Sequence, residues 1–532
     1  MSAQRQSRLL TLPSELRQQI YREYIYLDAE EGYTYDFEAG KLRTASPDKR
    51  PIDLNLMYTC RLVANEMRGL ALRIQTIRFS TLYSPELRIR AAKWEWLVYA
   101  EHFGAPPRWH VPLIAEYADD EMWDEITRRH SGTLLYQYMS HLRDYEEGGS
   151  CWGVCWNVYP RFEAPQTQGW GEAPSLYRET LTDIFELAMS DPDLRADIYQ
   201  NELRYLPRDA PWQIPTEKEI DLLAKNLMGV RWKTSKNRHH RDWHESYWNL
   251  SPGKYRFSAA ASAIHFLKSV PRHVRAHIRN IVLFEDHLSV ASPESHIRGL
   301  IPFCHENSAL RIERRAALWR NVFLWGNYFN EYFLWHRWTT PTTYSEFWNR
   351  GKPAEERGLP RPYLSRRLAQ WMAEAARPDI PDNITLLFDG DLIVEHTAKV
   401  FRDVVHLAAA VQESVDKALR IGEPGINPDE ALEKRIYSPF WQCDGFPRLL
   451  KEMCENHGKK SSFRIRCNFD PGCPVNEYRT SQILDAFRKE DYLWLCGVWS
   501  PYKEKVNTVS PLPCYYALWK KNLLPEGEQE WT

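Results

Sequence analysis

The sequence predicts a mixed α/β protein with a helical amino-terminal head, an aromatic-rich helical middle region and a carboxyl-terminal mixed α/β layer. Three observations predict this class. Two amphipathic helix patterns precede residue 80, further helical patterns lie between residues 91 and 252, and strand patterns alternate with helices beyond residue 253. We therefore divide the 532 residues into segments 1–90, 91–252 and 253–532.

The head contains two helix patterns. In the first, Pro13 suits a helix start, and Leu16, Ile20 and Tyr24 repeat every four residues as a narrow apolar stripe. The apolar positions of the second follow one helical face and are Leu56, Cys60, Val63, Met67 and Leu70. Residues 74–79 are expected to form a short closing strand. Residues 30–50, which carry acidic residues, Gly, Ser and Pro, are expected to form a loop.

Both helices of the head carry the motif of a known group of proteins. Residues 12–21 read Leu-Pro-x-Glu-Leu-Arg-x-x-Ile-Tyr, and residues 59–61 read Thr-Cys-Arg, followed by Glu66. This head resembles the F-box-like domain of a large group of uncharacterised filamentous-fungal proteins. A second resemblance to proteins of the same kind covers residues 261–321.

The resemblance implies a function in protein interaction rather than an enzymatic one. F-box domains dock on the linker subunit of cullin-based ubiquitin ligases, while the rest of the chain holds a substrate. By resemblance, the docking candidates are Leu12, Pro13, Leu16 and Ile20. The alternative is that these apolar residues form only an internal packing face, as most helix stripes do.

The middle region alternates between helices and irregular segments. Residues 91–147 and 176–189 have helical patterns, whereas 148–174 is rich in Gly, Pro and Trp. A basic stretch at 233–243 is interpreted as a solvated loop rather than a nucleic-acid site. The reason is that the 69 basic and 71 acidic residues of the chain nearly balance.

In the last segment strands alternate with helices. The expected strands are 278–284, 383–388, 463–469 and 492–498, and the expected helices are 257–269, 396–419 and 483–488. Residues 318–338 are the densest aromatic patch of a chain with 22 Trp, and predict a helix buried among others. No internal repeat is visible, so the sequence does not support a leucine-rich solenoid.

An enzymatic alternative rests on two strand ends. Asp389-Gly390-Asp391 follows one strand and Glu285-Asp286-His287 follows another. Two carboxylates after an apolar strand can hold Mg²⁺ beside substrate phosphates, which is the chemistry of metal-dependent glycosyl- or phosphoryl-transferases. This hypothesis requires the two groups to converge in a pocket. The competing interpretation is an ordinary Asp-Gly turn, and no nucleophile–base pair stands out.

Cofactors and a membrane span are not expected. The ten cysteines lack a paired metal-binding spacing, both at Cys151 and Cys155 and among Cys443, Cys454, His457, Cys467 and Cys473. There is no apolar run of membrane-spanning length and no signal-peptide core at the amino terminus. The sequence therefore predicts an intracellular protein, in the cytoplasm or nucleus, with reduced cysteines.

Overall fold

A computed structural model describes residues 7–26, 32–103, 105–144, 171–195, 210–228, 253–324, 359–420, 442–459, 463–473, 481–482 and 505–522. Within these residues a seven-stranded sheet has the order β2-β1-β3-β4-β5-β7-β8. The strands are β1 (Tyr33–Asp36), β2 (Lys41–Thr44), β3 (Thr76–Ser80), β4 (Asn280–Glu285), β5 (Arg311–Ala317), β7 (Ile384–Asp389) and β8 (Ile465–Cys467). A second pair joins β6 (Leu359–Pro360) to β9 (Lys505–Val506). The predicted mixed α/β class is confirmed.

The sheet is parallel except for the antiparallel pair β1–β2. From β3 to β8 the strands follow one another in chain order, so each new strand is added at the same edge. The predicted strands 278–284 and 383–388 are confirmed by β4 and β7, and 463–469 is shortened to β8. The connections differ widely in length, in keeping with the lack of a sequence repeat.

The loop prediction for residues 30–50 is wrong, because β1 and β2 form a hairpin there. The turn between them ends at Gly40, whose φ of 63° lies in the left-handed region that favours glycine. The Asp36 carboxylate accepts a hydrogen bond from the Ala39 backbone N–H at 3.0 Å. It also forms an ion pair with Arg43 of the neighbouring strand at 2.6 Å. The alternating Tyr33-Thr34-Tyr35 beside Gly32 was the strand signal in this sequence.

One face of the sheet is covered by helices. On every central strand this face carries buried apolar side chains, such as Ile77, Leu283, Ile312 and Phe388. The described helical segments of residues 253–532 are α12 (Ala259–Ser269), α13 (Arg272–Arg275), η4 (Pro293–Leu300), α14 (Ile301–Glu306), η5 (Leu318–Val322), α17 (Arg361–Ala375), α18 (Val394–Val400), η7 (Phe401–Val405), α19 (His406–Arg420), α21 (Phe446–Asn456) and α25 (Tyr515–Lys520). The covering layer comes mainly from α12, η4 and α14 over β3–β5, and from α17 and α21 over β7–β8.

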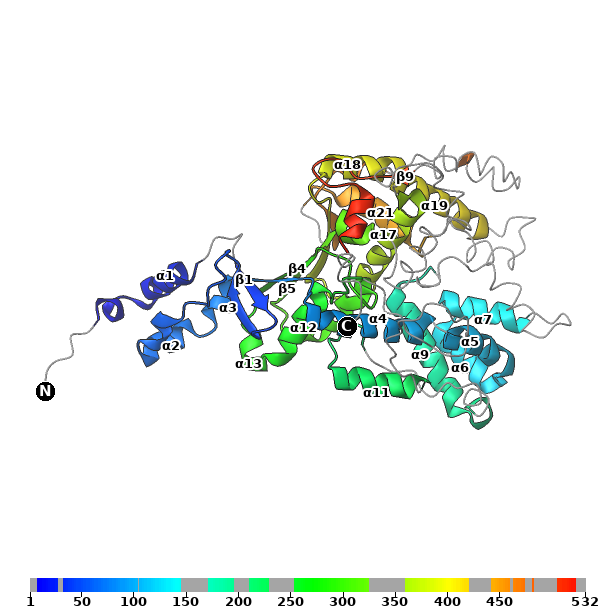
Figure 1. The fold of residues 1–532 in the computed structure, drawn as a ribbon, viewed down its shortest axis with the longest axis horizontal. Helices are drawn as coiled ribbons and strands as arrows, with labels where there is room; N and C mark the ends of the chain where they lie inside the picture. The colour runs from blue at the N-terminus through cyan, green and yellow to red at the C-terminus, as the bar shows by residue number, and fades with distance from the viewer. Residues whose placement is uncertain are drawn as a thin grey trace.

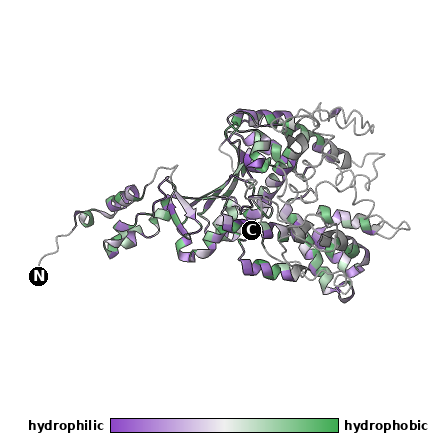
Figure 2. Ribbon diagram, viewed as in Figure 1, coloured by the Kyte–Doolittle hydropathy of each residue, from purple (hydrophilic) through white to green (hydrophobic). Residues whose placement is uncertain are grey.

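A group of helices beside the sheet has its own apolar core. These helices are α4 (Pro85–Phe103), α5 (Ala105–Tyr117), α6 (Asp120–His130), α7 (Leu134–Asp144), α9 (Pro174–Ser190) and α11 (Glu217–Met228). Ile114, Ile126, Leu135 and Ile184 lie in the core shared by α5, α6, α7 and α9. In Figure 2 these helices carry hydrophobic and hydrophilic residues mixed along the same ribbon, as amphipathic helices do.

The head projects from the opposite end of the molecule (Figure 1). It contains η1 (Arg8–Thr11), α1 (Ser14–Ile25), η2 (Asn55–Tyr58), α2 (Arg61–Met67) and α3 (Leu70–Ile74). A small core holds α1 against the other helices through Tyr21, Ile25, Val63, Met67 and Leu70. The same segment of the chain forms strands β1, β2 and β3 of the large sheet, and β3 pairs with β4, so the head is continuous with the sheet. At the outer edge of the sheet, Arg43 of β2 forms a bridge to Pro51.

Truncating a side chain on the covered face is expected to destabilise the fold more than truncating one on the opposite face. Leu283→Ala, on the covered face, is expected to lower the free energy of unfolding by about 2–5 kcal/mol, because it leaves a cavity in the core. Leu387→Ala, on the half-buried opposite face, is expected to cost about 1 kcal/mol. Urea unfolding monitored by circular dichroism measures both. Equal losses would contradict the assignment of the two faces.

Candidate functional site

The predicted docking residues lie on the outer side of α1. Leu16 is 47% exposed and Ile20 is 40% exposed, so both face away from the core of the head. Tyr24, one turn further along the stripe, is 39% exposed, and its hydroxyl is hydrogen-bonded to Asp53 and to the Leu56 backbone. Pro13 immediately precedes the helix and is exposed, and Leu12 is half-buried. The internal packing alternative therefore applies to the neighbouring face of α1, which carries Tyr21 and Ile25, and not to this stripe.

Other residues of the head motif hold the helices together. Arg17 forms a two-pronged ion pair with Glu66 of α2, with nitrogen–oxygen distances of 2.5 and 3.0 Å. The Tyr21 hydroxyl donates to the same carboxylate at 2.9 Å. The hydrogen bond from Arg17 lowers the pKa of Glu66, so this carboxylate stays ionised. Gln75 fixes the end of α1 by donating to the Ile25 carbonyl at 3.1 Å. The motif thus divides into a packing set and an exposed stripe.

The carboxylates of the enzymatic alternative have protein partners. Asp391 accepts from Arg320 at 2.5 and 2.8 Å and from the Trp319 backbone N–H at 3.1 Å. Asp389 accepts from the Asn468 amide at 2.8 Å and from the Asp391 backbone N–H at 3.0 Å. Asp391 has a φ of 56°, which Asp tolerates in a turn. These bonds are those of a closed Asp-Gly-Asp turn.

The position where open α/β sheets bind ligands is filled by the protein. Helix η5 lies across the carboxyl ends of β4 and β7, because Asn321 donates to the Glu285 carbonyl at 3.0 Å and Trp319 contacts Asp391. Asp286 bonds to Thr81 and His287 instead. The two groups of carboxylates do not converge. Within the described residues no three His, Cys, Asp or Glu side chains are placed to hold a metal ion.

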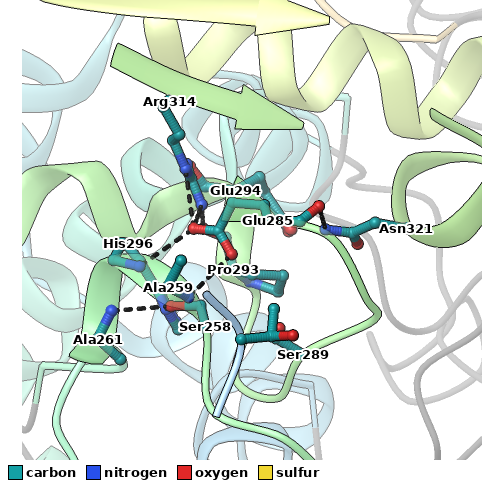
Figure 3. A network of polar contacts seen from close by, with 12 residues as sticks. Ser258, Ala259, Ala261, Glu285, Ser289, Pro293, Glu294, His296, Arg314 and Asn321 are labelled. Carbon is teal, nitrogen blue, oxygen red and sulfur yellow. Dashed lines mark hydrogen bonds and ion pairs between the residues drawn. The ribbon is translucent and has the colours of Figure 1, made fainter. Parts of the chain in front are cut away.

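A Ser–His pair lies inside the fold rather than in a cleft (Figure 3). His296 Nε2 lies 2.7 Å from the Ala291 carbonyl, so this nitrogen carries the proton, and Nδ1 accepts from the Ser258 hydroxyl at 2.6 Å. Ser258 also caps α12 by accepting from Ala261 N–H at 2.9 Å. Burial, together with the positive charge of Arg314, lowers the pKa of His296 to about 3. Both side chains are inaccessible, so the pair positions η4 on α12.

The same network contains a buried ion pair between adjacent strands. Glu285 of β4 is 0% exposed and Arg314 of β5 is 3% exposed, and they meet at 2.9 Å. The Glu285 carboxylate also accepts from the first backbone N–H groups of α12, at Ala259 and Ala260, where the helix dipole favours a negative charge. Arg314 donates to the Pro293 and Glu294 carbonyls and lies 4.1 Å from the centre of a Trp371 ring.

Two carboxyl-terminal cysteines, Cys454 and Cys467, each lie beside a histidine. Cys454 Sγ lies 3.9 Å from His406 Nε2, and Cys467 Sγ lies 3.6 Å from His457 Nδ1. Burial raises the pKa of both thiols to about 12, which opposes the thiolate form that binds metals. His406 Nε2 donates to the Pro471 carbonyl at 2.7 Å and is therefore protonated.

An open groove of about 680 Å³ lies on the face of the sheet that no described helix covers. The described residues of its lining include four arginines, from β3, β5 and β8, and two carboxylates. They are Arg78, Arg311, Arg315, Arg466, Glu313 and Asp382. The register places Phe284 beside Arg315, and the Arg78 and Arg315 guanidinium groups lie 6.0 and 5.6 Å from the centre of its ring. Side chains on this face alternate with the buried ones along each strand.

The groove was not predicted from the sequence, although a signal was present. Polar residues alternate with apolar ones in Ile77-Arg78-Phe79, Ile312-Glu313 and Ile465-Arg466-Cys467. Strands of parallel sheets are usually apolar on both faces, because helices cover both. Period-two alternation in strands joined by helices therefore indicates a parallel sheet with one open face.

Some predicted features lie outside the residues that the structure describes. They are the Cys151 and Cys155 pair, the basic stretch 233–243, residues 325–338 of the aromatic patch and the predicted elements 483–488 and 492–498. Of the aromatic patch, Leu318 to Leu324 is described, and this part forms a π-helical turn with Trp319, Phe323 and Leu324 buried.

Comparisons with known proteins give no relative, since no protein-family model, curated protein or solved structure matches this chain. Among the described helices, none combines the length and the apolar character that crossing a membrane requires. The geometry of the chain is therefore the basis for the functional inference.

Because Glu285 and Arg314 are buried together, the stability of the fold is expected to depend strongly on both side chains. Glu285→Leu leaves Arg314 buried without its carboxylate, and we expect a loss of about 3–5 kcal/mol in the free energy of unfolding. The double variant Glu285→Leu/Arg314→Met is expected to lose less, because no uncompensated charge remains. Urea unfolding of Glu285→Leu, Arg314→Met and the double variant gives the coupling free energy between the two side chains. Glu125→Ala, which breaks a surface pair on α6, is the control and should cost less than about 1 kcal/mol.

The buried histidine predicts a loss of stability in acid. The pKa of His296 is about 3 in the folded protein and 6.5 in the unfolded chain, so below pH 6.5 the unfolded chain binds a proton first. The stabilisation is present above pH 6.5 and declines by about 1.4 kcal/mol per pH unit as the pH falls toward 3. The unfolding free energy of His296→Gln, measured from pH 7 to 5, should decline less than that of the wild type. Parallel curves would refute the assignment.

Proposed function

We propose that this protein is an intracellular protein-interaction protein that acts as an F-box-like adaptor. In this proposal α1 docks on the linker subunit of a cullin-type ubiquitin ligase, and the α/β body holds a second protein. The observation that carries the proposal is the exposed apolar stripe of α1, formed by Leu16, Ile20 and Tyr24.

The composition of the stripe supports a protein partner. Two aliphatic side chains and a tyrosine on successive turns of one helix form a continuous apolar surface, and such surfaces on soluble proteins commonly bind other proteins. Arg17 and Tyr21, through Glu66, fix the neighbouring face of α1 to α2, so the stripe is held on a rigid element. The head also stands apart from the helices α4–α11, which leaves room around α1 (Figure 1).

The positions of the motif residues support the same separation into packing residues and exposed residues. In the group that the head resembles, Leu12, Pro13, Leu16 and Ile20 occupy the leading helix and the residues just before it. Three of these four side chains are exposed, and Leu12 is half-buried at the start of the helix. A purely structural motif would place its apolar members in the core of the head, where Tyr21 and Ile25 lie.

The proposal predicts that charge on the stripe abolishes docking. In Leu16→Arg/Ile20→Arg, two guanidinium groups replace apolar contacts, and the affinity of the full-length chain for a purified linker subunit is expected to fall at least tenfold. Biolayer interferometry measures this affinity. The melting temperature should stay close to that of the wild type, because both side chains are exposed.

A matched control separates docking from a general effect of charge. Leu222 on α11 is 58% exposed and far from the head, so Leu222→Arg should bind the linker subunit as the wild type does. Absence of wild-type binding, or equal binding by the stripe variant, would overturn the proposal.

A further inference from the structure

We infer that the open face of the sheet, between β3 and β8, is a binding site for an extended acidic peptide segment of a partner protein. The inference rests on the proposed function, because an adaptor needs a second surface that holds its substrate. It names the chemistry of that surface, and a direct binding measurement tests it without the ligase.

The charge of the groove favours an anionic ligand. Among the described residues of the lining, four arginines stand against two carboxylates, an excess of two positive charges. Both carboxylates are already engaged, since Glu313 pairs with Arg315 at 2.5 Å and Asp382 pairs with Arg464 at 3.1 Å. Arg311 and Arg466 are exposed on the same face. An acidic ligand therefore meets a groove of opposite net charge.

The spacing of the arginines favours several separate anions over one. One strand separates Arg78 of β3 from Arg315 of β5, and one strand separates Arg315 from Arg466 of β8, so the backbone positions within each of these two pairs lie about 10 Å apart across the sheet. Arg311 and Arg315 are four residues apart on one strand, which separates them by about 13 Å. A single phosphate needs donors that converge on one point. Carboxylates spread along an extended chain match the observed separation.

The floor of the groove favours a peptide over a nucleic acid. Val282 and Phe284 are half-buried in the middle of the lining, which gives an apolar surface for side chains between the acidic ones. The contacts of Arg78 and Arg315 with the Phe284 ring hold both guanidinium groups beside this floor.

The groove is part of a rigid surface. Its strands are tied by parallel backbone pairing from β3 to β8, and the covered face beneath is close-packed. Side chains at the groove are thus presented by strands rather than by loops. A peptide of about eight residues, extended to about 26 Å, would span the five strands.

Fluorescence anisotropy with the full-length chain tests the inference. The probe is a fluorescein-labelled eight-residue peptide of alternating Asp and Ala, measured at about 0.15 M ionic strength. The comparison ligands are the alternating Lys and Ala peptide and a single-stranded oligothymidine. We expect binding of the acidic peptide only, and at least a tenfold loss of affinity in Arg315→Glu/Arg466→Glu.

Two further variants make the result decisive. Arg315→Lys/Arg466→Lys keeps the charge and should retain most of the affinity, and Arg448→Glu on α21 removes an exposed arginine elsewhere and should bind normally. No binding by the wild type, equal binding by the Glu variant, or tighter binding of the oligothymidine would overturn the inference. Leu16→Arg/Ile20→Arg should bind the peptide like the wild type, so failure here is distinct from failure of docking at α1.

Discussion

The buried ion pair of Glu285 and Arg314 is the constraint on which the arrangement of sheet and helices depends. Two charges with almost no exposure are tolerated only when each has partners, and a single arrangement of β4, β5, α12 and the first residues of η4 supplies them. The pair therefore fixes where α12 and η4 lie on the sheet. The pair lies on the covered face, where α12 and η4 pack on the sheet.

Adjacent residues of β5 show how one strand serves two chemistries. Arg314 points into the core, where carbonyls, a carboxylate and the Trp371 ring surround it. Arg315 points to the groove, beside Phe284 and Glu313. The two-residue period of a strand gives the same residue type a structural role at one position and a surface role at the next. The second role exists because no described helix packs on the open face.

The local part of the fold could be predicted from the sequence, whereas the long-range part could not. Apolar periodicity located α1, α12, β4 and β7, because it depends on neighbouring residues alone. The apparent acidic sites at Asp391 and Glu285 have partners, Arg320 and Arg314, that lie far along the chain or across the sheet. The groove was missed for the same reason, since its arginines come from three strands of widely separated segments. The exposed stripe of α1 was foreseen as a candidate, but its exposure required the packing of α2.

The edges of the sheet bear on how the protein behaves at high concentration. A long, unpaired edge strand offers backbone groups to other molecules and promotes aggregation. At one edge, β2 is bridged to Pro51, which has no backbone N–H to offer. At the other edge of the described sheet, β8 is only three residues long and carries the exposed Arg466. Both features limit strand pairing between copies of the chain. The sheet can therefore present the face that no described helix covers without polymerising through its edges.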